Sequence, residues 1–129
     1  MDINVKYRAL HKLASHISER TKKSGFYDYV AHNEDYEGVP TFTLFISNSD
    51  DGEQYASCKF SENEFAETFR DTYNRFATGF NNKYCDKLSM RNPWTEKKWM
   101  KLPILINDSW EKMFPEVYKE QTNKLLLLI

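Results

Sequence analysis

At Ser61 the hydrophobic pattern changes from the alternation of a strand to the repeat of a helix. This change constrains the possible folds more than any other feature of the sequence. Residues 54–60, Gln-Tyr-Ala-Ser-Cys-Lys-Phe, alternate in the way that a half-buried strand does. The next four residues, Ser61-Glu62-Asn63-Glu64, have the form of a capping box and predict a helix with Ser61 as its N-cap. One stripe of this helix would face the core: Phe65, Phe69, Thr72, Tyr73, Phe76 and Phe80. Gly79 or the pair Asn81-Asn82 is predicted to end it.

Two more strands and a helix are predicted upstream of this point. Residues 26–30 are aromatic and β-branched, and residues 41–46 alternate with Phe42, Leu44 and Ile46 on one face. Asp51-Gly52 predicts a hairpin between the second and third strands, and the turn is expected to need only Gly52 for its geometry. The first segment is an amphipathic helix that Gly25 should stop. Its apolar face would consist of Ile3, Tyr7, Leu10, Ala14 and Ile17.

The last third of the chain predicts short helices. One would carry Trp94, Trp99 and Met100, and the next would run through Trp110, Met113 and Phe114. Pro115 either kinks that second helix or begins a new one. The apolar tail, Leu125–Ile129, is expected to be buried, mostly in the chain's own core, with burial against a second copy as the alternative.

The predicted fold class is therefore α+β. It comprises an N-terminal helix, a three-stranded antiparallel sheet, a long helix packed on that sheet, and a C-terminal extension of short helices. The length of 129 residues fits one domain, 1–129, which we divide into a core, 1–86, and a helical extension, 87–129.

Composition and cysteine content indicate a cytoplasmic protein. Apolar residues make up 40% of the chain and aromatic residues 16%, which is enough to fill a core. No apolar run approaches the roughly 18 residues that a membrane span needs, and Met1-Asp2-Ile3-Asn4 lacks the plan of a signal peptide. The two cysteines, Cys58 and Cys85, could form at most one bridge, and reduced thiols are expected.

Residue spacings give no indication of a cofactor, a metal or an enzyme. His11 and His16 lie five apart and His32 is distant, so the spacing typical of zinc ligands is missing. Carboxylate pairs such as Asp50-Asp51 fall in predicted turns, where water would keep both ionised and unsuited to acid–base catalysis. A nucleophile built on Cys58 or Cys85 with a histidine stays open as a third alternative.

Charge is distributed unevenly along the chain, although the net charge is only −1. Residues 1–25 contain six Lys and Arg against two Asp and Glu, residues 26–71 contain two against eleven, and residues 72–129 contain ten against six. An acidic middle between basic ends is the least ordinary feature of the sequence. Turn formation and helix starts explain several of these acids, whereas Glu34-Asp35-Tyr36-Glu37 has no evident structural reason.

The order of a helix, three strands and a helix also occurs in double-stranded RNA-binding domains. Those domains need a basic start to the second helix, where lysines reach the phosphates. Here that position reads Ser61-Glu62-Asn63-Glu64-Phe65-Ala66-Glu67, whose carboxylates the RNA backbone would repel. The sequence argues against direct nucleic-acid binding through this face.

The sequence has a second resemblance, to a family whose binding surface is acidic like the middle of this chain. Three features of the sequence resemble the small phage anti-CRISPR proteins that inhibit type II effector nucleases. They are the segment Asp50-Asp51-Gly52-Glu53-Gln54-Tyr55, the segment Ser61-Glu62-Asn63-Glu64, and the aromatic helix with Phe69 and Tyr73 that follows. The resemblance covers residues 3–86. The chain departs from the family in two features. The family has an acidic run after the aromatic helix, where this chain has Tyr84-Cys85-Asp86-Lys87, and the Trp-rich extension has no counterpart in the family.

The resemblance implies a plug whose carboxylates occupy a groove that reads DNA. Mimicry is also a physical hypothesis in its own right, because proteins that grip DNA line their channels with Lys and Arg. The predicted function is thus a non-enzymatic inhibitor from a phage or mobile element, acting in the host cytoplasm on a protein partner with a basic nucleic-acid-binding groove. The alternative is an assembly protein that forms oligomers, such as a homodimer, through its aromatic, leucine-rich C-terminus. The predicted partner-binding residues are Glu34, Asp35, Glu37, Asp50, Asp51, Glu53, Glu62 and Glu64.

Overall fold

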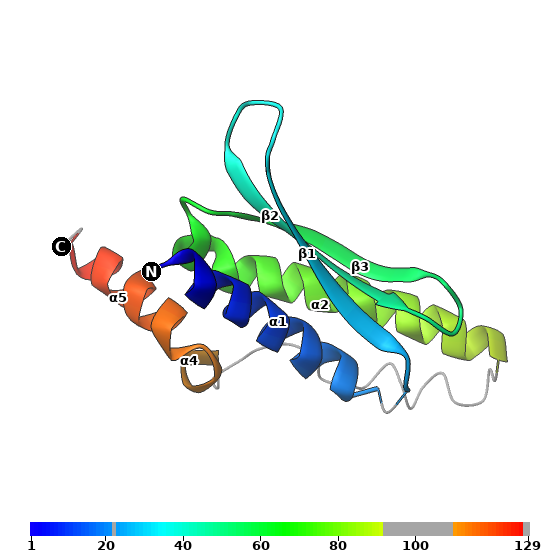
Figure 1. The fold of residues 1–129 in the computed structure, drawn as a ribbon. Helices are drawn as coiled ribbons and strands as arrows, with labels where there is room; N and C mark the ends of the chain where they lie inside the picture. Colours follow the sequence, from blue (N-terminus) through cyan, green and yellow to red (C-terminus); the bar gives the residue numbers. More distant parts are fainter. Residues whose placement is uncertain (22, 92–109, 128–129) are drawn as a thin grey trace.

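The computed structural model describes residues 1–21, 23–91 and 110–127. In chain order they form α1 (Ile3–Glu19), β1 (Phe26–Glu34), β2 (Pro40–Asn48), β3 (Gln54–Ser61), α2 (Phe65–Arg91), α4 (Trp110–Met113) and α5 (Pro115–Leu127). The strands make one antiparallel sheet in the order β1-β2-β3. The predicted α+β fold, with its N-terminal helix, three-stranded sheet and long helix, is confirmed (Figure 1).

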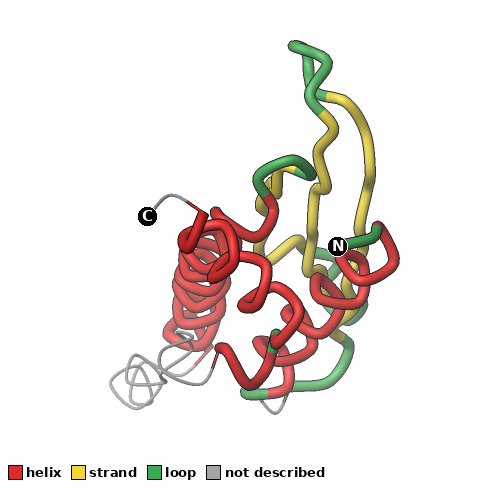
Figure 2. Tube along the Cα trace, turned by 90° about the vertical axis from the view of Figure 1, so that its left-hand side faces the viewer, coloured by secondary structure: helices red, strands yellow, loops and turns green. Residues whose placement is uncertain are grey.

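Both long helices pack against the same face of the sheet (Figure 2). The ring of Phe42 on β2 shows this, because it contacts Tyr7 of α1 at 5.1 Å between ring centroids and Phe65 of α2 at 5.9 Å. As predicted, Phe42, Leu44 and Ile46 are buried on this inner face. The opposite, outer face carries Tyr27, Tyr29 and Phe45 and is turned away from both helices.

The first helix begins at Asp2, whose side chain accepts a hydrogen bond from the backbone N–H of Val5 at 3.0 Å. Its buried face consists of Ala9, Leu10, Leu13, Ala14 and Ile17, whereas Ile3 is 39% exposed. The helix ends at Glu19, before the predicted stop at Gly25. Gly25 instead has a φ of 91° in the turn that leads into β1.

The long helix α2 begins at Phe65, a few residues later than an N-cap at Ser61 predicts, and it continues further than predicted. Ser61 Oγ accepts a hydrogen bond from the Glu64 N–H at 3.4 Å, and the whole predicted aromatic stripe from Phe65 to Phe80 is buried. The predicted end at Gly79 or Asn81-Asn82 is wrong, because α2 runs to Arg91. Phe80 and Tyr84 continue the buried stripe against Phe26 of β1, with ring centroids 5.3 and 6.5 Å apart, so packing outweighs the low helix propensity of the glycine.

The C-terminal helices dock onto this core. Pro115 begins α5 directly after α4, and the intervening Phe114 is 2% exposed against the rings of Phe69 and Tyr73. Phe114 and Val117 thus belong to the same hydrophobic cluster as residues of the predicted core 1–86, although both lie in the predicted extension. The predicted helix with Trp94, Trp99 and Met100 lies outside the described residues.

The expected burial of the C-terminal tail in the chain's own core is wrong for two of its residues. Leu125 is 57% exposed and Leu126 is 62% exposed. Both residues lie in the last turns of α5, beyond the buried Phe114 and Val117 at its start.

Candidate functional site

The predicted acidic surface is divided between two ends of the sheet. The β1–β2 turn, residues 35–39, carries Asp35 and Glu37 and follows Glu34, while the β2–β3 turn, residues 49–53, lies at the other end. Since β2 spans Pro40–Asn48, the two turns lie roughly 26 Å apart at one residue per ~3.3 Å. Glu62 is at the same end as the β1–β2 turn, because its N–H donates to the Pro40 carbonyl oxygen at 3.0 Å.

Asp35 fixes the shape of the β1–β2 turn. Its Oδ1 accepts hydrogen bonds from the N–H groups of Glu37 at 2.8 Å and Val39 at 2.9 Å. Its N–H donates to the Val39 carbonyl oxygen at 2.9 Å, and its carbonyl oxygen accepts from Gly38 at 2.9 Å. The prediction that this acidic segment has no structural role is therefore wrong for Asp35, which forms an Asx turn.

The residues around Asp35 are presented to solvent at the tip of a projecting hairpin (Figure 1). Tyr36 is 96% exposed, and Glu34 and Glu37 on either side of it are exposed as well. Within the described part of the chain, no Lys, Arg or His lies within ion-pair distance of Glu34 or Glu37. The tip thus combines an ordered turn, an exposed aromatic ring and two carboxylates that are not neutralised.

Asp51 in the β2–β3 turn is held by its own chain. Its Oδ2 accepts a hydrogen bond from the Tyr55 hydroxyl at 2.5 Å and lies 3.2 Å from Lys87 Nζ and 3.4 Å from Lys23 Nζ. The Tyr55 hydrogen bond, followed by the charges of Lys87 and Lys23, lowers the pKa of Asp51 below its ordinary value. Asp51 Oδ1 also accepts from the Glu53 N–H at 3.0 Å. The turn therefore needs Asp51 as well as Gly52, contrary to the expectation from sequence.

The other predicted acids also divide into paired and unpaired groups. Glu53 pairs with Lys87 and lies 3.8 Å from Lys83, and Glu62 lies 3.1 Å from His32 Nε2. Asp50 and Glu64 are exposed, and no cation of the described residues is within ion-pair distance of either. Of the eight predicted residues, Asp51 and Glu53 are thus already paired with lysines, and Glu62 has a contact with His32.

Sequence reasoning missed the aromatic part of the outer sheet face. Tyr27 is 54% exposed and Tyr29 is 59% exposed, and the Tyr29 ring packs on Phe45 of the neighbouring strand at 5.8 Å. A shallow hollow there is lined by Tyr27, Asp28, Tyr29, Phe45, Ser47 and Gln54. The alternation of Phe26-Tyr27-Asp28-Tyr29 contains the signal, because a strand with one buried face must show its other side chains to solvent.

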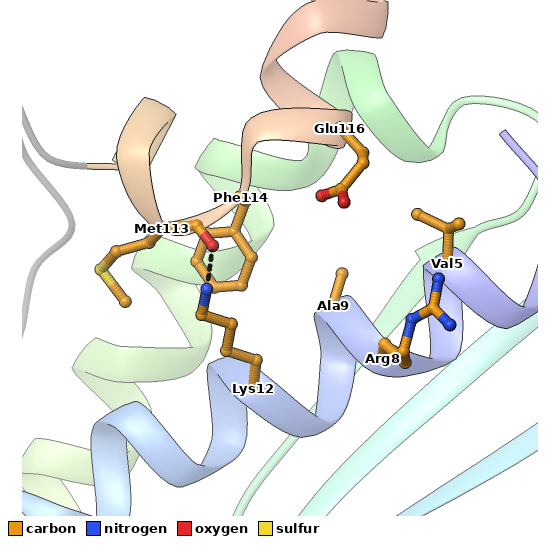
Figure 3. A pocket seen from close by; sticks show the side chains of 7 residues that line it. All are labelled: Val5, Arg8, Ala9, Lys12, Met113, Phe114 and Glu116. Carbon is orange, nitrogen blue, oxygen red and sulfur yellow. Dashed lines mark hydrogen bonds between the residues drawn. The ribbon is translucent and has the colours of Figure 1, made fainter.

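A second cavity lies between α1 and the junction of α4 and α5 (Figure 3). Lys12 Nζ donates to the Met113 carbonyl oxygen at 2.5 Å and lies 5.6 Å from the centre of the Phe114 ring. Arg8 lines this cavity from α1 and Glu116 lines it from α5. Lys12 thereby supplies a hydrogen bond to the carbonyl at the end of α4 and fastens the C-terminal helices to α1.

Cys58 is partly buried and Cys85 is buried. Burial raises the pKa of the Cys58 thiol, which disfavours the reactive thiolate, and Cys85 is buried with its Sγ 3.6 Å from Asn81 Oδ1. In the ranges 1–21, 23–91 and 110–127, no three His, Cys, Asp or Glu side chains gather as metal ligands would. None of the helices described there is both long and apolar enough to cross a membrane.

We compared the chain with known proteins in three ways. Family models, curated proteins and solved structures gave no match to it.

Proposed function

We propose that this chain is a non-enzymatic inhibitor that inserts the acidic tip of its β1–β2 hairpin into the basic nucleic-acid-binding groove of a partner protein. The observation that carries the proposal is the tip itself. Tyr36 is 96% exposed between two uncompensated carboxylates, on a turn that Asp35 holds with two hydrogen bonds. An ordered loop loses little conformational entropy on binding, and an exposed tyrosine is a frequent anchor in protein interfaces.

Charge explains why a DNA-binding groove is the favoured partner. Such grooves contain Lys and Arg, because duplex DNA presents one negative charge per roughly 1.7 Å of its axis. Glu34 and Glu37 offer carboxylates at the tip, and Glu64 adds one at the same end of the sheet. Asp51 and Glu53 contribute less, since their charges already pair with Lys87 or Lys23, and Glu62 is held in a contact with His32. The resemblance found in the sequence makes a type II CRISPR effector nuclease the first partner to test.

The experiment measures inhibition of DNA cleavage by such a nuclease and the affinity of the chain for it. We expect Glu34→Lys/Glu37→Lys and Tyr36→Ala each to weaken binding at least tenfold while the melting temperature stays unchanged, because all three side chains are exposed. The matched control is Glu19→Lys/Asp71→Lys, which makes the same charge change at two exposed positions away from the tip. It should bind like the unmodified chain.

Salt supplies an independent measurement. Affinity should fall steeply between roughly 50 and 500 mM salt, since charges across a groove are screened within about 8–10 Å at physiological ionic strength. Equal weakening by the tip variant and by the control would show a general charge effect and would overturn the assignment to the tip. A nuclease unaffected by the unmodified chain would exclude that partner, and the same variants would then be compared by capture from lysate at low and high salt.

One observation favours the alternative of an assembly protein. Leu125 and Leu126 are 57% and 62% exposed on α5, where a second molecule could cover them. In that case Leu125→Glu/Leu126→Glu would reduce the mass of the particle in solution. The tip variants would leave the mass unchanged.

A further inference from the structure

β1 is an open edge of the sheet. Among the described residues, where the strand order is β1-β2-β3, it is bonded to β2 alone. The N–H of Asp35 donates to the Val39 carbonyl oxygen, and the N–H of Ser49 donates to the Gly25 carbonyl oxygen, both at 2.9 Å. These bonds mark the odd-numbered residues of β1 as the ones bonded to β2, because bonding alternates along an antiparallel strand. The backbone groups directed away from the sheet belong to Phe26, Asp28, Val30, His32 and Glu34.

This edge lacks most features that stop strands from pairing with other chains. β1 contains no Pro, Lys or Arg, and its nine residues pair with β2 in an unbroken register. The other edge, β3, has Lys59, an irregular register between Ile46 and Ser47, and α2 packed along it. The protective feature present on β1 is a pair of groups that point toward the helix side: Asp28, bonded to His11, and His32, 3.1 Å from Glu62.

We propose that β1 pairs with β1 of a second copy, antiparallel, about a two-fold axis at Val30. Residues that face each other then have numbers that sum to sixty, so Asp28 lies opposite His32 of the other copy at two symmetric places. Tyr29 lies opposite Ala31, and outward-directed residues face outward-directed residues throughout, as hydrogen bonding requires.

Charge selects this register from its neighbours. An axis at Asp28 brings two Asp28 carboxylates together, and an axis at Ala31 brings Asp28 against Glu34. An axis at Tyr29 leaves Asp28 opposite Val30, with no charged residue facing it on the other strand. Opposite charges facing each other across strands stabilise pairing, and like charges oppose it. Asp28 and a protonated His32, which would repel other strands, therefore attract an identical strand.

The exposed tyrosines favour the same arrangement. Strands in a sheet lie about 4.8 Å apart, so Tyr29 would contact the small side chain of Ala31 and reach the other Tyr29 diagonally. The Tyr29–Phe45 contact in each copy would extend into one aromatic row across the joined sheets. The hairpin tips would point in opposite directions and stay free, so the proposal is independent of the inhibitor function.

The test is sedimentation of the full chain over a wide range of concentrations, with amide hydrogen exchange by NMR. We expect a reversible dimer in which the amides of Asp28, Val30 and His32 become protected as the concentration rises. The amides of Tyr27 and Tyr29 should be protected at all concentrations, since they bond to β2. Val30→Pro removes an outward-directed N–H, which edge strands tolerate, and should abolish the dimer without unfolding the chain.

Charge variants keep the proposal falsifiable if the proline disturbs folding. His32→Asp should weaken the dimer about tenfold or more by placing two carboxylates opposite each other, and Asp28→His in the same chain should restore it. Asn33→Asp, which adds a negative charge one residue away on the outer face, is the matched control and should have a smaller effect. A monomer at all concentrations would overturn the proposal. So would a dimer that responds to Leu125→Glu/Leu126→Glu and not to the β1 variants, or protection of these amides only by another protein.

Discussion

The carboxylate of Asp51 accepts a hydrogen bond from the Tyr55 hydroxyl at 2.5 Å, and both groups lie against two lysines from distant parts of the chain. Lys23 and Lys87 are 5.7 and 5.5 Å from the centre of the Tyr55 ring and also contact Asp51 Oδ2. Lys23 precedes β1 and Lys87 comes from the last turns of α2. One carboxylate therefore joins three segments at this end of the molecule.

Replacing Asp51 should lower stability in a pH-dependent way. The pKa of Asp51 is lowered in the folded chain, so its contribution is present above the unfolded value of about 3.9 and is lost as the pH falls through the folded pKa. Asp51→Asn should thus reduce the melting temperature at pH 7, and the difference from the unmodified chain should shrink below about pH 4. Asp50→Asn, at an exposed neighbour, is the control and should change little. Thermal unfolding monitored by circular dichroism at several pH values measures both.

Replacing each of two glycines by alanine should change the free energy of unfolding in opposite directions. Gly79 lies in an exposed position of α2, and an added Cβ would meet nothing within 4 Å, so Gly79→Ala should stabilise the chain by about 1 kcal/mol. Gly25 has a φ of +91°, and a Cβ there would lie 2.9 Å from Asp50 Oδ2. Gly25→Ala should cost about 1–3 kcal/mol.

Gly38→Ala separates the two causes at Gly25. Its φ is +82°, but a Cβ would lie in open space, so it should show the cost of the backbone conformation without a contact. Denaturation in urea would measure all three variants. A Gly25→Ala chain no less stable than Gly38→Ala would show that the contact with Asp50 relaxes freely.

Phe114 should be the most costly residue to truncate in the C-terminal helices. It is 2% exposed, with its ring 4.9 Å from that of Phe69 and beneath the Lys12 ammonium group. Phe114→Ala should cost about 3–5 kcal/mol in the free energy of unfolding. Leu126→Ala, at a side chain that is 62% exposed, should change it by less than about 0.5 kcal/mol. Similar small losses from both variants would mean that α4 and α5 contribute little to the stability of the core.

Local patterns in the sequence were sufficient to predict the order of the elements. The capping residue Ser61, the turn residue Gly52 and the two hydrophobic periods each act over a few residues, and each is present in the structure. The end of α2 could not be predicted in this way. Gly79 lowers helix propensity locally, but Phe80 and Tyr84 gain burial against Phe26, which lies more than fifty residues earlier in the chain.

The residues of the candidate site could be predicted from the sequence, but which of them lie together in the structure could not. The sequence indicated carboxylates between the first two strands and in the β2–β3 turn. The structure puts Asp35 and Glu37 in the β1–β2 turn, but Glu34 is the last residue of β1. Which carboxylates remain available depends on partners such as Lys87, thirty-six residues from Asp51, and no spacing rule reaches that far. The prediction also ended α2 too early, and this removed Lys83 and Lys87 from the helix that brings them to the turn.

The bond from Lys12 to the Met113 carbonyl joins residues that are 101 positions apart. During synthesis on a ribosome, α1, the sheet and α2 would leave the exit tunnel well before the segment that carries Phe114. Until that segment arrives, the rings of Phe69 and Tyr73 would lack their cover. The nascent chain would therefore pass through a period in which an aromatic surface between its two long helices is open to chaperones.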